Sequence, residues 1–161
     1  MVCAVALPGY KAAGYIAGVM ASQVQPAGVD LRVESVFSFN SPGLLGVEKR
    51  VLSNVVEVPL TNGFWELGPG AYKVRFVEAV EVPLGYVGFC FPRSSLLRMG
   101  AYVGCAVWDP GYRGRGEALL YVVNPHGIRL EAKARIVQLV FIRMEEEPGE
   151  GYRGVYQGEN L

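Results

Sequence analysis

The chain has 161 residues, enough for one domain with a substantial core but too few for two large domains. Lysine plus arginine and aspartate plus glutamate each total 15, so the net charge is zero, and the positive field that attracts nucleic acid or an anionic membrane is missing. Hydrophobic residues make up 51% and charged residues 19%, which favours burial of part of the surface against other subunits. We therefore expect an oligomer that binds neither nucleic acid nor membrane.

Residues that could perform chemistry are few. The acidic residues include only two aspartates, Asp30 and Asp109, and the one histidine is His126. This inventory excludes aspartate clusters, HExxH zinc sites and a Ser-His-Asp triad with spare partners. A metal ion that takes part in a reaction must therefore receive most of its ligands from the substrate.

The three cysteines are an odd set without a CxxC spacing. Cys90 and Cys105 lie in apolar, strand-like runs, so we interpret the cysteines, with Cys3, as free thiols, those two being buried. Free thiols indicate a reducing setting, and the expected location is cytoplasmic. The longest uncharged stretch, residues 12–29, contains proline, glutamine and glycine and is a poor membrane span.

In chain order, the first expected elements are a helix and a strand. Residues 10–22 can form a short helix. The stretch after Asp30 alternates between apolar and polar residues, which is typical of a half-buried strand. Its expected apolar face consists of Leu31, Val33, Phe37 and Phe39.

Turn signals and short apolar runs alternate along the rest of the chain. Asn62-Gly63 predicts a tight hairpin, and a turn at 68–70 precedes the alternating strand of Tyr72, Val74 and Phe76. A short helix can form at 94–99, and further strands are expected at Tyr86 to Phe91, Ala101 to Trp108, Ala118 to Val123 and Ile136 to Met144. Many short strands with closely spaced turns predict an all-β barrel or sandwich-like domain over residues 1–144.

The composition changes after Met144. Residues 145–161 are charged and rich in glycine. Such a segment alone is expected to be a flexible tail, and a tail of this kind can close an active site.

The segment PRSSLLRMG at 92–100 combines cations with hydroxyl groups. Arg93 and Arg98 flank Ser94 and Ser95, and with exposed backbone amides this combination suits phosphate oxygens. An ordinary alternative is a helix start with serine as its N-cap. These residues alone leave both interpretations open.

The segment CAVWDPGYRGRGEALLYVVNP at 105–125 presents an acid and a phenol at the tip of a hairpin. Asp-Pro-Gly is common turn chemistry, so Asp109 by itself can be only a turn former. The flanking strands are strongly apolar, however. In that setting a carboxylate can meet a bound water, and the ring of Tyr112 can cover a sugar.

Two further polar residues stand next to or within apolar strands. Asp30 directly precedes an alternating strand and either hydrogen-bonds its own turn or serves a site. Gln138 is a lone amide in the apolar strand ARIVQLVFIRM, so it needs partners inside the fold or at a site.

Taken together and in this order, four motifs resemble those of the dUTPase and dCTP deaminase superfamily. They read AGVDL at 27–31, RSSL at 93–96, DPGYRG at 109–114 and RIVQL at 135–139. The similarity extends from about Gln25 to Arg143, and residues 66–83 also resemble the family's segment before the serine motif. The resemblance implies a β-clip fold, which is a distorted barrel, and a homotrimer with active sites shared between subunits.

The resemblance also implies an activity. This is the hydrolysis of dUTP at the α-phosphate to dUMP and pyrophosphate, with Mg²⁺ held on the triphosphate, which serves nucleotide-pool sanitation and dTTP synthesis. Asp109 would be the base that activates water, and Tyr112 would pack on the deoxyribose and exclude a 2′-hydroxyl. Main-chain groups of the hairpin around Val107, Trp108 and Leu119 would bind uracil.

Other roles follow from the same resemblance. Phosphates or the nucleophilic water would be bound by Arg93, Ser94, Ser95, Arg98 and Gln138. Asp30 would be structural or reach Mg²⁺ through water. The usual dUTPase tail with its stacking Phe is absent, so Tyr152 or Tyr156 would supply that ring.

The sequence departs from the family pattern in ways that bear on the reaction. Ser94 and Arg98 match the deaminase branch, but the glutamate of that branch falls on Tyr121 when counted back from Asn124. Tyrosine, with a pKa of about 10, cannot shuttle protons as a carboxylate does. RGRGEALL contains two more residues than the usual family spacing. If a β-bulge accommodates them, Glu117 would move toward the position of the deaminase glutamate.

We therefore interpret the chain as a dUTPase. Three alternatives stay open on the sequence alone. They are a dCTP deaminase, a bifunctional deaminase-diphosphatase and a catalytically inactive nucleotide-binding regulator.

Overall fold

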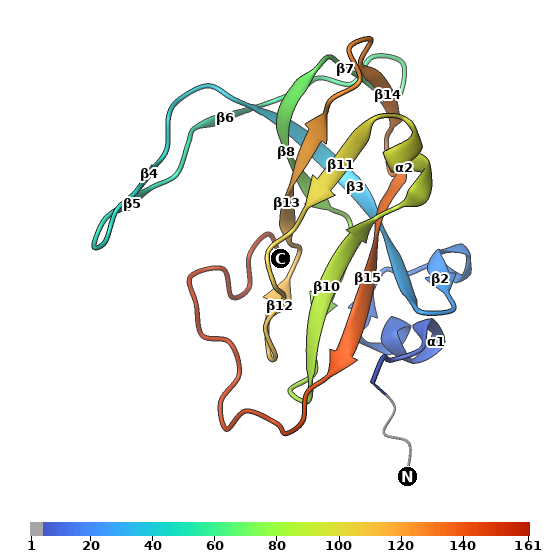
Figure 1. The fold of residues 1–161 in the computed structure, drawn as a ribbon, viewed down its shortest axis with the longest axis vertical. Helices are drawn as coiled ribbons and strands as arrows, with labels where there is room; N and C mark the ends of the chain where they lie inside the picture. The colour runs from blue at the N-terminus through green and yellow to red at the C-terminus, as the bar shows by residue number, and fades with distance from the viewer. Residues whose placement is uncertain (1–4) are drawn as a thin grey trace.

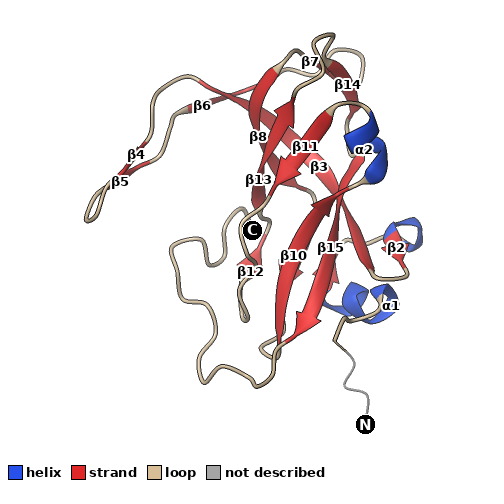
Figure 2. Cartoon of the chain, in the orientation of Figure 1, coloured by secondary structure: helices blue, strands red, loops and turns tan. Residues whose placement is uncertain are grey.

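One large antiparallel sheet forms the body of the protein in a computed structural model that describes residues 5–161 (Figures 1 and 2). Across this sheet the strands lie in the order β10 (Tyr86–Pro92), β15 (Arg135–Arg143), β3 (Gly28–Phe39), β8 (Gly70–Phe76), β13 (Glu117–Val122) and β11 (Ala101–Gly104). Two shorter strands, β2 (Val24–Gln25) and β6 (Val55–Glu57), pair with β3 outside this order.

The two ends of the sheet are joined by one backbone bridge. The amides of Gly88 in β10 and Trp108 after β11 donate to each other's carbonyl oxygens at 2.9 and 3.0 Å. The sheet therefore curls into a distorted barrel, and the expected all-β architecture of many short strands is confirmed. Because Trp108 directly precedes Asp109, this closure also fixes the start of the candidate hairpin.

Three small sheets complete the fold. Their strands are β1 (Ile16–Ala17) with β9 (Ala79–Glu81) and β12 (Arg113–Gly114), β7 (Phe64–Leu67) with β14 (Ile128–Glu131), and β4 (Leu44–Leu45) with β5 (Arg50–Val51). The predicted hairpin at Asn62-Gly63 precedes β7. Both residues have positive φ angles, 53° and 81°, as a type I′ turn requires.

The core fills the interior of the barrel with aliphatic and aromatic side chains from the main sheet. Fully buried members include Val29, Leu31, Val33, Val74, Phe76, Leu120, Leu139 and Phe141. Their spacing of two residues along each strand is the period expected for a sheet with one buried face. Cys90 and Cys105 are half-buried and free, and Cys3 lies outside the described residues.

The predicted apolar face of β3 is wrong in its second half. Val33 pairs with Phe76 of β8, but Ser35 pairs with Arg75, so Glu34 is an extra residue in a β-bulge. The bulge reverses which residues point into the barrel. Val36 is fully buried, whereas Phe37 is only half-buried and Phe39 is 40% exposed.

The helix expected over residues 10–22 is also wrong in its extent. Only α1 (Gly9–Ala12) is an α-helix, and two 3₁₀ segments, η1 (Ala13–Tyr15) and η2 (Ala21–Gln23), flank β1. Ile16 pairs with Val80 of β9, and Gly18 has a φ of 82°, so the chain turns away from a helical path. The second expected helix is present as α2 (Ser94–Arg98).

Two segments lie outside the barrel. Residues 40–57, which include β4, β5 and β6, extend away from the body as an arm (Figure 1), and the pairing of β6 with β3 joins the arm to the main sheet. Residues 145–161 contain no strand or helix and run back along the body to β12. Among residues 5–161, no helix is both long and apolar enough to cross a membrane.

Candidate active site

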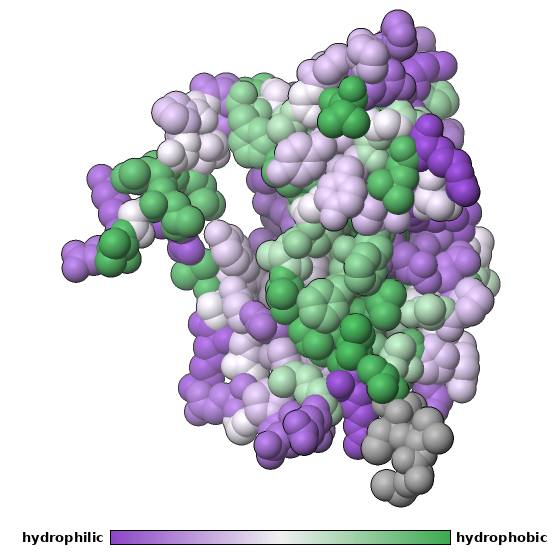
Figure 3. Space-filling model, viewed as in Figure 1, coloured by the Kyte–Doolittle hydropathy of each residue, from purple (hydrophilic) through white to green (hydrophobic). Residues whose placement is uncertain are grey.

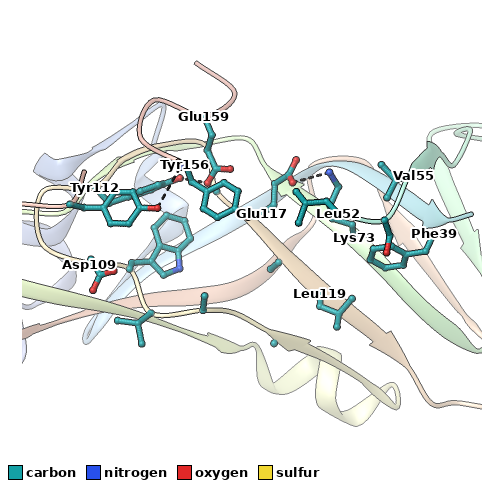
Figure 4. Close-up of a pocket in the computed structure, with 18 residues that line it drawn as sticks. Phe39, Leu52, Val55, Lys73, Asp109, Tyr112, Glu117, Leu119, Tyr156 and Glu159 are labelled. Atoms are coloured by element: carbon teal, nitrogen blue, oxygen red, sulfur yellow. Dashed lines mark hydrogen bonds and ion pairs between the residues drawn. The ribbon is translucent and has the colours of Figure 1, made fainter. Parts of the chain in front are cut away.

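The segment DPGY forms a tight turn that presents Asp109. The Tyr112 amide donates to the Asp109 carbonyl at 3.1 Å, and Gly111 has a φ of 81°, as expected for glycine at the third position of a type II turn after proline. Backbone bonds of 2.8 and 2.9 Å between Val82 and the turn hold it against the body. Asp109 is exposed, and no hydrogen bond or ion pair joins its carboxylate to the other residues drawn in Figure 4.

Two aromatic rings stand beside this carboxylate. The rings of Trp108 and Tyr112 meet edge to face with centroids 5.3 Å apart, and both residues are buried. Glycines from the RGRG sequence make room for them. A Cβ atom on Gly116 would lie 2.5 Å from the Trp108 ring, and one on Gly114 would lie 2.6 Å from the Tyr112 hydroxyl.

A cavity of about 670 Å³ opens next to the turn (Figure 4). It brings together seven of the residues predicted from sequence, namely Val107, Trp108, Asp109, Tyr112, Leu119, Tyr152 and Tyr156. Its wall is mostly apolar, with a few polar groups, as is typical of sites for small organic ligands. The far end is formed by Phe39 of β3 and by Leu52, Ser53 and Val55 of the arm.

One carboxylate inside this cavity is neutralised by two cations. Glu117 of β13 lies 2.8 Å from the Lys73 ammonium and 3.1 Å from the Arg75 guanidinium, both on β8 (Figure 4 shows the contact with Lys73). β13 pairs with β8 without a register shift from Glu117 to Val122. No bulge therefore moves Glu117 along the strand, and it stays four residues from Tyr121, about 13 Å in an extended chain.

The C-terminal segment forms one wall of the cavity. The Tyr112 hydroxyl donates to Glu159 Oε1 at 2.7 Å, and the Tyr152 ring contacts the Tyr112 ring edge to face. Backbone bonds from Tyr152 to Pro110 and from Gly158 to Arg113 extend this contact along the hairpin. Burial, followed by the hydrogen bond to Glu159, raises the pKa of Tyr112, so the phenol stays protonated.

Asp30 lies away from this cavity, in a cluster of donors. Its side chain is 1% exposed, and Oδ2 lies 3.2 Å from Arg93, 3.3 Å from Arg135 and 3.2 Å from the Gln25 amide. Burial is the largest influence on the Asp30 carboxyl and raises its pKa, although both arginines oppose it. This enclosure is consistent with the structural role that the resemblance implies for Asp30, and a role on Mg²⁺ through water stays a prediction.

The serine motif lies beside Asp30. Ser94 begins α2, and its N-cap is Arg93 without a side-chain capping bond, so the alternative of a serine N-cap is wrong. Both serines are exposed. Gln138 is half-buried on β15 directly opposite Asp30 on β3. We call Arg93, Ser94, Ser95, Arg98, Gln138 and Asp30 the Ser94 cluster.

The candidate residues of a single chain thus form two separate groups. No member of the Ser94 cluster lines the cavity. Sequence reasoning missed Phe39, Lys73, Glu159 and the arm residues, since these reach the cavity from distant parts of the chain. The Glu34-Ser35 pair of adjacent polar residues was a signal that could have revealed the bulge and the outward position of Phe39.

The residues present also limit how a metal ion can bind. Within the described residues 5–161, no group of three or more His, Cys, Asp or Glu side chains could hold a metal ion. Asp109 is the one carboxylate of the cavity that Figure 4 draws without a partner. This donor set fits an ion that arrives with the ligand and keeps its waters, as Mg²⁺ does.

The closed barrel and the hairpin-borne carboxylate define a protein of the dUTPase and dCTP deaminase class, as the four motifs indicated. Comparison with known proteins gives the same result. The family described as dCTP deaminase-like matches residues 10–144, and this chain belongs to it.

Curated relatives cover nearly the whole chain. A protein of Aeropyrum pernix named probable deoxyuridine 5'-triphosphate nucleotidohydrolase is 53% identical over 92% of this chain and 93% of its own. A protein of Methanocaldococcus jannaschii named deoxyuridine 5'-triphosphate nucleotidohydrolase is 41% identical over 84% of this chain and 88% of its own.

Solved structures share the fold. The 2'-deoxycytidine 5'-triphosphate deaminase of Agrobacterium tumefaciens matches 87% of this chain and 48% of its own with a TM-score of 0.64 and 22% identity. The native EIAV dUTPase matches 91% of this chain and 93% of its own with a TM-score of 0.53 and 15% identity.

Proposed function

We propose that this protein is a dUTP diphosphatase that hydrolyses dUTP to dUMP and pyrophosphate. The observation that carries the proposal is Asp109, an exposed carboxylate on a rigid turn beside the Trp108–Tyr112 ring pair in an apolar cavity. The names of the curated relatives support this choice of substrate. The product dUMP would serve dTTP synthesis, and removal of dUTP would keep the nucleotide pool clean.

In this mechanism Asp109 is the general base. It orients a water molecule beside the α-phosphorus and takes its proton as the new P–O bond forms. The bond between the α-phosphorus and the bridging oxygen breaks, and pyrophosphate leaves with the electron pair. Because Asp109 carries no ion pair in Figure 4, its carboxylate is available for this proton.

The hairpin around Asp109 would bind the nucleoside. The Tyr112 ring packs on the deoxyribose, where an added 2′-hydroxyl would overlap with it. Main-chain groups between Val107 and Leu119 hydrogen-bond uracil, while Tyr152 and Tyr156 are the aromatic candidates of the tail wall.

Magnesium is part of the substrate in this proposal. It binds the triphosphate oxygens and, when bound, neutralises their charge for phosphoryl transfer. Arg93, Ser94, Ser95 and Arg98 are the candidates that contact those oxygens, and Gln138 is a candidate for the phosphates or the water. Asp30 fixes the Arg93 guanidinium through their 3.2 Å contact.

The separation of the cavity from the Ser94 cluster supports a homotrimer with shared sites. In a ring of three chains, the cavity of one subunit meets the Ser94 cluster of the next. Co-expression of Asp109→Asn with Gln138→Ala tests this arrangement. Random assembly restores about a quarter of the sites if each site uses two chains, and no recovery would place both groups in one chain.

A dCTP deaminase is the second candidate, because Glu117 lines the cavity. Two observations weigh against it. Lys73 and Arg75 pair with this carboxylate, and the unshifted register of β13 keeps Tyr121 four residues farther along the strand. We therefore propose that deaminase activity is absent.

One assay distinguishes the candidate functions. Purified protein is incubated with Mg²⁺ and either dUTP or dCTP, and the products are identified. Pyrophosphate from dUTP without ammonia from dCTP is expected. Ammonia release that disappears in Glu117→Gln would establish a deaminase, and the absence of both products would indicate a nucleotide-binding regulator.

A further inference from the structure

The arm, residues 40–57, exposes six of its aliphatic side chains to solvent. Its outer end, with β4 and β5, stands clear of the barrel in Figure 1, and the space-filling view in Figure 3 shows hydrophobic side chains along it. The exposed aliphatic residues are Leu44 (51%), Leu45 (86%), Val47 (105%), Val51 (45%), Leu52 (62%) and Val56 (52%). Exposed aliphatic side chains that gather on one projecting element are typical of an interaction site.

The arm is ordered by few bonds of its own. β4 and β5 contribute two residues each. The amide of Asn40 donates to the Asn54 carbonyl at 3.0 Å, and the Gly46 amide donates to the Lys49 carbonyl at 2.8 Å. The Arg50 guanidinium lies 5.6 Å over the Tyr156 ring of the C-terminal segment. An isolated two-stranded hairpin is marginally stable in water, so a further contact on the aliphatic side chains would stabilise this one.

A second apolar surface lies beside the Ser94 cluster. Its members are exposed apolar side chains in α2 and in the residues that flank α2 along the chain, namely Phe91 (55% exposed), Leu97 (50%), Met99 (39%) and Tyr102 (49%). We call it the α2 patch. Each chain thus carries a projecting apolar element and, at a different place, an apolar surface that an equivalent element can cover.

Two different surfaces that fit each other produce a head-to-tail contact, which closes into a ring when the rotation between subunits permits. Three residues at the root of the arm, Leu52, Ser53 and Val55, already line the cavity. A subunit docked on the arm therefore lies at the rim of that cavity. Since its α2 patch adjoins its Ser94 cluster, docking brings the phosphate candidates toward Asp109 of the first chain.

We propose that the arm docks on the α2 patch of a second copy of this chain and thereby assembles the composite active site. The inference deepens the proposed function and rests on its shared trimer. Two observations favour a second copy as the partner. The α2 patch offers an apolar surface for the arm, and the Ser94 cluster beside it contains the phosphate-binding candidates that do not line the cavity of the same chain.

The test removes the apolar surface at the end of the arm, away from the cavity. In the full-length protein, Leu45→Ser combined with Val47→Ser should raise the dissociation constant of the trimer at least about a hundredfold. Sedimentation equilibrium should then give the mass of one 17.5 kDa chain at micromolar concentration, where wild type gives three times that mass. Val5→Ser, at a residue 62% exposed outside the arm, is the control and should leave the trimer intact.

A cross-linking experiment identifies the docking surface independently. A photoreactive phenylalanine analogue at Val47 should form covalent dimers and trimers, with the attached peptides drawn from residues 89–104. Cross-links to other proteins only, a monomeric wild type, or an arm variant that stays trimeric would each overturn the inference. Pyrophosphate release by wild type is measured separately, so failure of the proposed function is distinguished from failure of arm docking.

Discussion

The Tyr112 hydroxyl donates a 2.7 Å hydrogen bond to the carboxylate of Glu159, which lies 47 residues away near the C-terminus. The ring that we propose to pack on the deoxyribose is therefore held in place by the chain's own tail. A ring fixed before the nucleotide arrives loses little freedom on binding, which favours affinity and selectivity.

Docking of the tail should weaken as the pH rises. Burial, the largest cause, and the nearby Glu117 raise the pKa of Glu159 above its usual 4.5, although the hydrogen bond from Tyr112 opposes them. The docked tail thus binds a proton more tightly than the free tail. Docking is strongest below pH 4.5 and declines as the pH passes through the raised pKa.

Amide hydrogen exchange measures this equilibrium. Protection of the Tyr152 and Gly158 amides, which are bonded to the hairpin, should fall over that pH range after correction for intrinsic exchange. Glu159→Gln keeps a hydrogen-bond acceptor without a titrating group and should remove the pH dependence. Protection in wild type that is constant from pH 4 to 7.5 would contradict the prediction.

Asp109→Asn should lower turnover by about 10² to 10⁴, the usual contribution of a general base, with little change in nucleotide affinity or folding. Asparagine preserves the size and the turn but cannot take a proton. If Asp109 were only a turn former, turnover would hardly change. Steady-state kinetics with dUTP measure the turnover number of Asp109→Asn. The control is Glu81→Gln, which changes an exposed carboxylate outside the cavity and should leave turnover unchanged.

Tyr112→Ala should raise activity on UTP relative to dUTP, because the ring no longer overlaps with the 2′-hydroxyl. Tyr112→Phe is the matched variant. It keeps the ring and should keep the discrimination, while it loses the bond to Glu159 and loosens the tail. The measurement is the ratio of kcat/KM for UTP to kcat/KM for dUTP in each variant. An unchanged ratio in Tyr112→Ala would assign sugar selection to other residues.

Gly116→Ala should destabilise the fold by about 1 to 3 kcal/mol, since its Cβ would meet the Trp108 ring at 2.5 Å. Trp108 closes the barrel through Gly88, so the cost extends to the hairpin. Thermal unfolding measures the loss as a fall in Tm of several degrees. Gly149→Ala, where an added Cβ meets nothing within 4 Å, should leave Tm unchanged.

Local signals predicted the parts of the structure that depend on local chemistry. Asn62-Gly63 fixes a turn through its own backbone preferences, and Val107 to Leu119 come together because one hairpin contains them all. Phe39, Lys73 and Glu159 reach the cavity from three distant segments, so no short window of sequence could place them there.

The errors have physical causes as well. The prediction that Phe37 and Phe39 share the buried face of Leu31 required an unbroken alternation along β3. The pairing with β8 instead shifts between Val33 and Ser35, because Glu34 is an additional residue in a bulge. The helical composition of residues 10–22 was overridden by pairing of Ile16 with Val80, a tertiary contact. The separation of the Ser94 cluster from the cavity within one chain is set by the tertiary fold, which short sequence patterns do not contain.

The bulge at Glu34 divides the 12-residue strand β3 between two tasks. Before the bulge, alternate side chains pack the barrel. After it Val36 still packs the barrel, while Phe37 and Phe39 face the side on which Lys73 and the cavity lie. Substitutions at Phe39 can therefore reshape the far end of the pocket without leaving a hole in the barrel interior. The binding site and the stability of the fold can change independently here, which makes the end of β3 a natural place for altering ligand preference.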